Sequence, residues 1–180
     1  MDKHLHYGAT AKALHWLVVG LLVVQYFIGW FMPDIKRGMT PGVAMTLHVS
    51  IGTSILAVIV ARLVWRMTHP VAPESSLPPW QRLTSEAVHW LLYLLVLATT
   101  LSGWLFASAR GWTMSWFFMV PLPMLTAGNA RLLRTIDGWH QDFEWALLIL
   151  IGLHVAAALL HLVYYRDGVM QRMLPQSLRP

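Results

Sequence analysis

Four long apolar runs dominate the pattern of hydrophobic and polar positions along the chain. They cover about residues 13–32, 43–65, 87–109 and 145–165, and shorter polar or proline-containing segments separate them. A helix needs about 20 apolar residues to cross the roughly 30 Å hydrocarbon core of a bilayer, and each run reaches that length. The pattern therefore predicts a single all-α domain over residues 1–180, with four transmembrane helices and both termini on one side.

The connections between these runs differ in character. The first two are short and contain prolines, which are typical of turns that end helices. The third connection, Gly111 to Ala127, is apolar and aromatic but is interrupted by Pro121 and Pro123, and we expect it to lie at the membrane interface. From Asn129 onward apolar side chains recur at helical spacing. The fourth helix is therefore predicted to begin above the membrane and to cover about residues 130–165.

The composition supports a membrane protein and excludes several kinds of cofactor and partner. Of the residues, 57% are hydrophobic and only 12% are charged, whereas soluble domains have roughly 25% charged residues. The net charge of +5 does not indicate a nucleic-acid partner, because the basic residues lie between the apolar runs, where they act as topology signals. The absence of cysteine excludes disulfides, iron–sulfur clusters and covalent haem attachment.

The distribution of lysine and arginine predicts the orientation of the chain. Of 13 such residues, eight lie on the side that holds both termini and the second connection, and five lie on the other side. Cytoplasmic loops of membrane proteins carry an excess of basic residues. We therefore expect both termini to face the cytoplasm of a bacterial cell, with the helices in the inner membrane.

Histidines are the candidate functional residues. Six of the nine lie within or at the edge of the apolar runs: His15, His48, His89, His140, His154 and His161. Ionisable side chains at membrane depth are costly and usually functional, although single histidines also bond across helices. The 14 residues from His140 to His154 return to within about 40° of the same helix face and rise about 21 Å. One helix can thus offer a ligand near each membrane surface, which favours two stacked macrocycles over one metal ion.

Depth along the helices indicates which histidines pair. His48 lies near the outer surface at the level of His140, so these two can hold an outer haem. The inner side has four candidates: His15, His89, His154 and His161. His154 is favoured because it shares a face with His140, and His15 is its natural opposite. A faint internal repeat, with a Gly-Trp pair 14 residues after both His15 and His89, favours pairing those two instead.

Two glycines and an arginine fit the same arrangement. Gly29 and Gly103 lie about four turns beyond the first histidine of their helices, where glycine either lets a flat ring approach the backbone or allows close helix packing. Arg62 lies 14 residues after His48, near the inner end of the same face. It can pair with a haem propionate or anchor the helix at the cytoplasmic surface.

These segments together resemble the bacterial cytochrome b561 family of four-helix membrane cytochromes. The resemblance rests on "LHW" at His15, "LHVSIG" at His48, "VHWLLYLL" at His89, "WH" at His140 and "GLHVAAALLH" from residue 152, and it covers almost the whole chain. It implies an integral membrane four-helix bundle with two non-covalent b haems stacked across the bilayer. Carried onto this sequence, the iron ligands are His15 with His154 and His48 with His140.

One branch of this family is a superoxide oxidase, and this chain is similar to it in size and in its histidines. The resemblance implies that superoxide gives its electron to the outer haem and that the haem pair reduces ubiquinone. Bis-histidine iron has no open position, which suits outer-sphere electron transfer. Four basic residues near the outer entrance would attract the anion or contact headgroups: Lys36, Arg37, Arg131 and Arg134. His89 and His161, left over after haem ligation, are predicted to form a quinone site and to supply protons.

Two other functions fit part of the pattern. A membrane anchor that links a separate redox protein to the quinone pool needs a docking surface, for which Gly111 to Ala127 is a candidate. A transporter or channel without a redox cofactor would leave the spacing of His140 and His154 unexplained. No carboxylate lies within the four apolar runs to support an ion path through the membrane.

Overall fold

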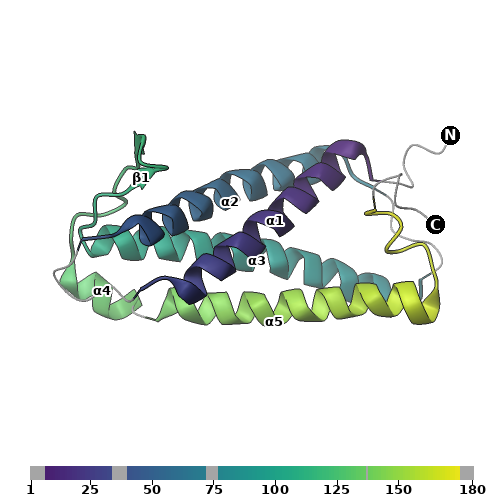
Figure 1. Cartoon of the computed structure of the whole chain (residues 1–180). Helices are drawn as coiled ribbons and strands as arrows, with labels where there is room; N and C mark the ends of the chain where they lie inside the picture. The colour runs from purple at the N-terminus through teal and green to yellow at the C-terminus, as the bar shows by residue number, and fades with distance from the viewer. Residues whose placement is uncertain (1–6, 34–39, 72–76, 137, 175–180) are drawn as a thin grey trace.

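The computed structural model describes residues 7–33, 40–71, 77–136 and 138–174, and within them the chain is mostly helical (Figure 1). The elements in chain order are α1 (Ala9–Phe31), α2 (Val43–Thr68), α3 (Pro79–Ala109), β1 (Ser115–Trp116), β2 (Val120–Pro121), α4 (Ala130–Ile136), α5 (Trp139–Leu160) and the π-helical turn η1 (His161–Tyr165). The two short strands pair in antiparallel fashion in the connection between α3 and α4.

Four segments are long and apolar enough to cross a membrane: α1, α2, α3 and the segment from α4 through η1. This confirms the predicted architecture of an all-α membrane bundle. Large apolar side chains cover the outside of the helices, and Phe27, Leu94 and Ile149 are each more than half exposed. A soluble protein would bury such side chains, whereas lipid tails are a suitable environment for them.

The helix bounds differ from the apolar runs in three places. Helix α1 begins at Ala9 and α3 begins at Pro79, so both extend beyond the apolar core at their first residues. Proline is favourable at the start of α3 because the first helical N–H has no intrahelical partner. The predicted continuous helix over 130–165 is instead divided into α4 and α5. Gly138, between them, has φ of 90°, a conformation that glycine adopts readily and that ends a regular helix.

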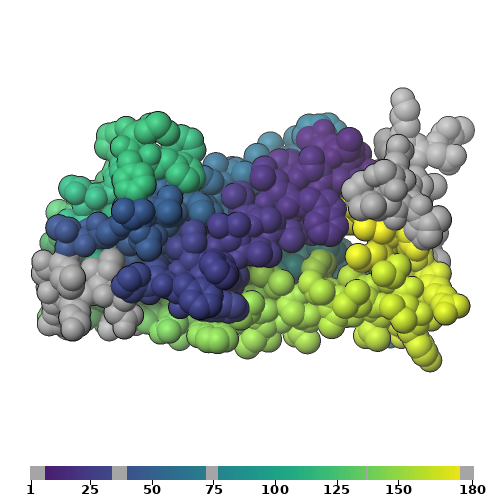
Figure 2. All heavy atoms as spheres, viewed as in Figure 1, coloured from purple at the N-terminus to yellow at the C-terminus, as the bar shows by residue number. Residues whose placement is uncertain are grey.

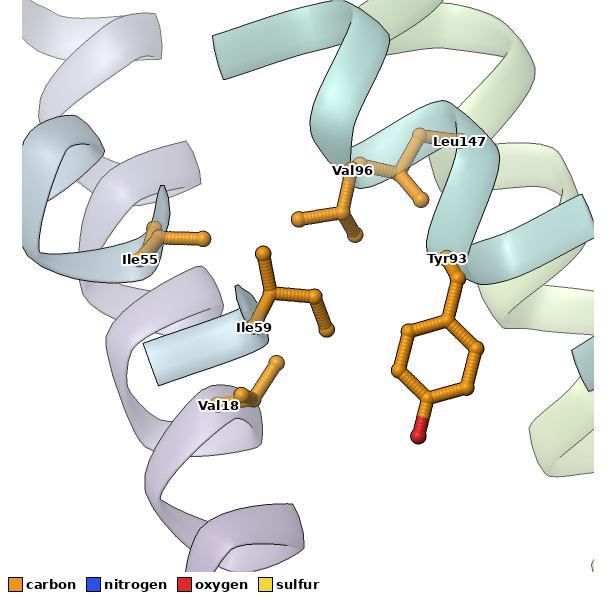
Figure 3. Close-up of a cluster of buried hydrophobic side chains, with 6 residues drawn as sticks. All are labelled: Val18, Ile55, Ile59, Tyr93, Val96 and Leu147. Atoms are coloured by element: carbon orange, nitrogen blue, oxygen red, sulfur yellow. The ribbon is translucent and has the colours of Figure 1, made fainter. Parts of the chain in front are cut away.

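The helices pack in two pairs, α1 with α2 and α3 with α5, and α2 joins the pairs through α3. A small apolar core lies where these helices meet: Val18, Ile55, Ile59, Tyr93, Val96 and Leu147 (Figure 3). In the part of the chain that the structure describes, α5 has no comparable backbone packing against α1 or α2. Side chains, among them those of His48 and His140, therefore approach one another across the space between α5 and the first helix pair.

The two ends of the bundle differ in the segments that lie there. At one end the start of α1 meets the last described residues, because Lys12 Nζ donates to the Leu174 carbonyl at 3.0 Å and Trp16 Nε1 donates to the Met173 carbonyl at 3.0 Å. We call this the terminal end. The opposite end carries the β1–β2 hairpin and α4, and we call it the hairpin end (Figure 1).

Candidate functional site

At the hairpin end, His48 of α2 and His140 of α5 face each other across the bundle. Their ring centroids are 6.1 Å apart and their planes are inclined by 82°. A ligating imidazole nitrogen lies about 2.0–2.1 Å from its metal, so two rings on opposite sides of one metal have centroids roughly 6–6.5 Å apart. The observed separation matches the one expected for two ligands of one metal. The structure thus brings together the two histidines that depth along the helices predicts to pair.

The hydrogen bonds of His140 leave one ring nitrogen available for a metal. Its Nδ1 lies 2.8 Å from the Thr99 carbonyl oxygen on α3. A carbonyl only accepts, so Nδ1 carries the proton and the lone pair is on Nε2. Metal-ligating histidines usually donate their other N–H in this way, which fixes the tautomer and the ring orientation.

The surroundings of His48 contain polar atoms without protein partners. Its Nε2 lies 3.1 Å from Nε2 of Gln25 on α1. Among the described residues, His48 Nδ1 and Gln25 Oε1 are both buried without a hydrogen-bond partner. Buried polar groups are nearly always paired, so these two atoms favour a site shaped around a further group. Gln25 was missed by sequence reasoning, although a lone amide inside an apolar run is a detectable signal.

A cavity of about 210 Å³ lies between these histidines and α1, α2, α3 and α5, and its lining is mainly apolar. Gly29, Gly52 and Gly103 all line it. A Cβ added at Gly103 would lie 2.7 Å from the His140 ring, and one at Gly29 would lie 3.5 Å from the His48 ring. Of the two glycines singled out in the sequence, Gly103 makes room for the His140 imidazole, whereas a Cβ at Gly29 would make only an ordinary contact with the His48 ring.

At the terminal end, three of the four candidate histidines gather. The rings of His89 (α3) and His154 (α5) have centroids 5.3 Å apart. His15 of α1 lies within range of electrostatic interaction with both. His89 Nδ1 donates to the Ser85 carbonyl at 2.6 Å, which leaves its Nε2 lone pair free. His15 Nδ1 is 2.6 Å from the Arg62 guanidinium, which can only donate.

His161, the fourth candidate, lies apart from this cluster. Its Nδ1 is hydrogen-bonded to Asp167 Oδ2 at 2.6 Å, at the start of η1. A second cavity, of about 240 Å³, opens at the terminal end and is lined by His89 but not by His161. The structure therefore does not place the two predicted quinone-site histidines in the same cavity.

Two arginines of α2 line this second cavity. The Arg62 guanidinium lies 5.7 Å from the Tyr93 ring centroid, and that of Arg66 lies 5.1 Å from the Trp90 centroid and 5.6 Å from the Tyr93 centroid. Stacking on aromatic faces orients the guanidinium groups, and such forks bind carboxylates well. Arg66 was not singled out from the sequence, although it lies one turn after Arg62 on the same helix face.

The predicted steering residues fall into two groups. Arg131 and Arg134 are exposed on α4 at the hairpin end, where Asn129 Oδ1 accepts the backbone N–H groups of Arg131 and Leu132 and so caps the helix. Lys36 and Arg37 lie outside the described residues.

The donor set suits a macrocycle better than a bare metal ion. Among the described residues, no three histidine or acidic side chains come together as a metal site. The Nε2 lone pair of His140 is available to a metal, whereas His48 Nε2 lies 3.1 Å from the Gln25 amide nitrogen, which would have to move for His48 to bind through that atom. Two histidines leave a metal short of ligands, and a haem would supply the remainder as its four nitrogens. The apolar cavity, the buried atoms without partners and the glycines at its wall therefore fit a haem.

A bundle of four membrane-length helices that encloses opposed histidines is typical of a membrane cytochrome of the b type. Residues 6–176 match the family described as prokaryotic cytochrome b561, and the chain belongs to this family, which confirms the resemblance found in the sequence. It is accordingly a multi-pass bacterial membrane protein that binds b-type haem and transfers electrons.

Curated relatives align with nearly the full chain. Cytochrome b561 homolog 2 of Escherichia coli (strain K12) is 32% identical, over 95% of this chain and 92% of the relative. A probable superoxide oxidase of Yersinia pestis is 30% identical, over 97% of this chain and 98% of the relative. Cytochrome b562 of Cereibacter sphaeroides is 25% identical, over 97% and 98%.

Proposed function

We propose that the chain is a dihaem cytochrome that passes electrons from superoxide, at the hairpin end, to ubiquinone, at the terminal end. The observation that carries the proposal is the opposition of His48 and His140 at 6.1 Å, with His140 Nδ1 held by the Thr99 carbonyl. These two histidines would hold the outer haem. The similarity to a probable superoxide oxidase supports the choice of electron donor.

For the inner haem we propose His154 and His15 as ligands. Helix α3 packs directly along α5, and the His89 and His154 rings are already 5.3 Å apart. That is about 1 Å less than two ligands of one metal need. Helices α1 and α5 are not packed in this way in the described part of the chain, so a flat ring between His15 and His154 would not have to separate two closely packed helices. Arg62 would then release His15 Nδ1 and hold a propionate.

When bound, the haems supply one-electron transfer. The protein supplies the ligands and the charges that attract the substrate. Two superoxide anions lose one electron each and become dioxygen, while one ubiquinone takes up two electrons and two protons and becomes ubiquinol. His48 and His140 would hold the outer haem from both sides and so would keep oxygen species from binding to its metal. Superoxide would therefore need only to approach the edge of the site, where Arg131 and Arg134 would raise its local concentration. Lys36 and Arg37 keep the steering role expected from the sequence, but they lie outside the described residues.

The protons for ubiquinone would come from the terminal end. His89 lines the second cavity beside Arg66 and Tyr93, where it can face a quinone oxygen. His161, held by Asp167 at 2.6 Å, lies at the same end of the bundle and can pass protons from the cytoplasm. The excess of basic residues on the terminal side supports this orientation, with the hairpin end periplasmic and both termini cytoplasmic.

The direct test is an optical spectrum and haem count of the detergent-purified protein, followed by mixing with a superoxide source with and without a ubiquinone analogue. We expect two b haems per chain, rapid reduction by superoxide, and continued superoxide consumption only when the quinone is present. Two haems that superoxide does not reduce would contradict the oxidase function and favour an anchor that carries electrons for another redox protein.

The glycine beside His140 provides a test of the outer site. In Gly103→Ala, the new methyl group would lie 2.7 Å from the His140 ring, so the ring must shift. Overpacking of this kind costs about 1–3 kcal/mol, which corresponds to roughly a 5- to 150-fold loss in affinity for the outer haem. Haem titration of the apoprotein measures it. Gly20→Ala is the matched control, because a Cβ there meets nothing within 4 Å; equal affinity in the two variants would contradict the assignment.

The exposed arginines of α4 provide a test of electrostatic steering. We expect the double substitution Arg131→Glu and Arg134→Glu to lower the rate of reduction by superoxide about 3- to 10-fold at low ionic strength, since it reverses the local field. The difference should shrink at 0.5 M salt, where the Debye length is only about 4 Å. Arg82→Glu, at the exposed start of α3 on the terminal end, is the control. A rate that does not respond to charge or salt would contradict steering by α4.

A further inference from the structure

The hairpin between α3 and α4 has an unusual backbone at its turn. Ser115 pairs with Pro121 and Trp116 pairs with Val120, and the Met119 N–H donates to the Trp116 carbonyl at 3.0 Å. Phe117 and Phe118 have φ of 46° and 64°, a region that large side chains seldom occupy. The surrounding contacts must therefore hold this turn in place.

Those contacts come first from two serines of α2. Ser50 is completely buried; its Oγ accepts the Phe117 N–H at 2.8 Å and lies 3.3 Å from the Ser115 carbonyl oxygen. Four residues further along α2, Ser54 Oγ accepts the Trp116 indole N–H at 3.1 Å. The polar groups of the first strand and the turn thus face the helix.

The second arm of the connection is attached to α3. The Trp104 indole donates to the Pro123 carbonyl at 3.0 Å, and the Leu125 N–H donates to Ser108 Oγ at 3.1 Å. Two transmembrane helices therefore fix the segment from residue 114 to residue 125, which we call the aromatic hairpin. It is a fixed projection of the bundle.

The outward side of the aromatic hairpin is apolar. Phe118 is 57% exposed, Met119 72% and Val120 51%. The sequence from Gly111 to Ala130 contains no charged residue. Figure 2 shows this segment, in green, as a separate bulge on the surface of the bundle. Monomeric soluble surfaces seldom carry such a patch, and a protein interface normally surrounds its apolar centre with a polar rim.

The position of the hairpin along α2 shows what surrounds it. The 26 residues of α2 make a helix of about 39 Å, some 9 Å longer than the roughly 30 Å hydrocarbon core. Ser50 and Ser54 lie about 10 and 16 Å from its first residue, and thus beside the membrane-embedded part of the helix. The hairpin projects sideways from this part of the bundle (Figure 1), next to the lipid-facing surface.

We propose that the aromatic hairpin inserts into the outer leaflet of the bilayer, with Phe118, Met119 and Val120 among the upper acyl chains. Lipid is the partner that its chemistry fits: the exposed tip is uncharged and apolar, and the hydrogen bonds to α2 and α3 satisfy groups that would be costly to leave unpaired in lipid.

Site-directed labelling can test the proposal cleanly, because the chain has no cysteine. Met119→Cys would carry a nitroxide label, and the haem-loaded protein would be placed in vesicles of phosphatidylethanolamine and phosphatidylglycerol. We expect the label to collide with membrane-dissolved oxygen and to be shielded from an aqueous nickel chelate by about fivefold or more, as for a group buried 5–10 Å below the surface. Thr135→Cys on the exposed face of α4 is the matched control, and its label should be open to nickel.

Two outcomes would overturn the proposal. One is a Met119 label as accessible to nickel as the Thr135 label. The other is a label that is open in vesicles of the purified protein and becomes shielded only in native membranes, which would indicate a protein partner. Haem content, measured on the same samples, verifies that each variant is folded, and the labelling result does not depend on which electron donor the protein uses.

Discussion

Replacement of His140 by alanine is expected to remove one haem from the protein and to leave the other in place. Its ring opposes His48 at 6.1 Å and is oriented by the Thr99 carbonyl, so no other imidazole in the described part of the chain is positioned to take over. Loss of a hydrogen bond that merely orients a ligand already costs about 10- to 100-fold in metal affinity, and loss of the ligand should cost more. Haem per chain should fall from two to one.

The remaining haem should also respond differently to superoxide. Because the outer haem would be the entry point, we expect reduction by superoxide to slow by at least about tenfold, as an inner haem is buried from the periplasmic side. His69→Ala is a suitable control for haem content, since His69 stacks on Trp65 at 3.8 Å and opposes no other histidine among the described residues. Two haems retained in His140→Ala would show that His48 and His140 are not a ligand pair.

The second large effect concerns the inner haem. His15→Ala and His154→Ala should each lose the same haem, and the double variant should lose no more than either single one, because the two residues act on one site. His89→Ala should keep both haems but reduce ubiquinone more slowly, because His89 lines the second cavity. Haem counts and the separate absorption bands of the two haems measure all four variants.

This comparison decides between two arrangements that the terminal end permits. If His89→Ala loses a haem and His15→Ala keeps both, then the ligands are His89 and His154, and their 5.3 Å separation must widen when haem binds. In that case Arg62 would remain on His15 Nδ1, and the proposed exchange of Arg62 onto a propionate would be wrong. The outer pair is unaffected by either result.

The sequence alone was sufficient to predict the features that depend on the length of the apolar runs and on the period of the α-helix. Four apolar runs of membrane length predict four helices because backbone groups in lipid must be paired within a helix, and four such segments are present. The motifs around the histidines were sufficient for the family. Depth along a helix follows from its rise per residue, so the neighbourhood of His48 and His140 could also be predicted.

Only the tertiary structure decided which helices are neighbours, because periodicity gives the face and the depth of a residue but not the helix opposite to it. The packing of α3 along α5 places His89 beside His154, and it places Gly103 against His140. The contact of Gln25 with His48 depends likewise on how α1 crosses α2. The break at Gly138 and the hairpin anchored by Ser50 depend on local backbone conformations and long-range hydrogen bonds, which leave no periodic trace in the sequence.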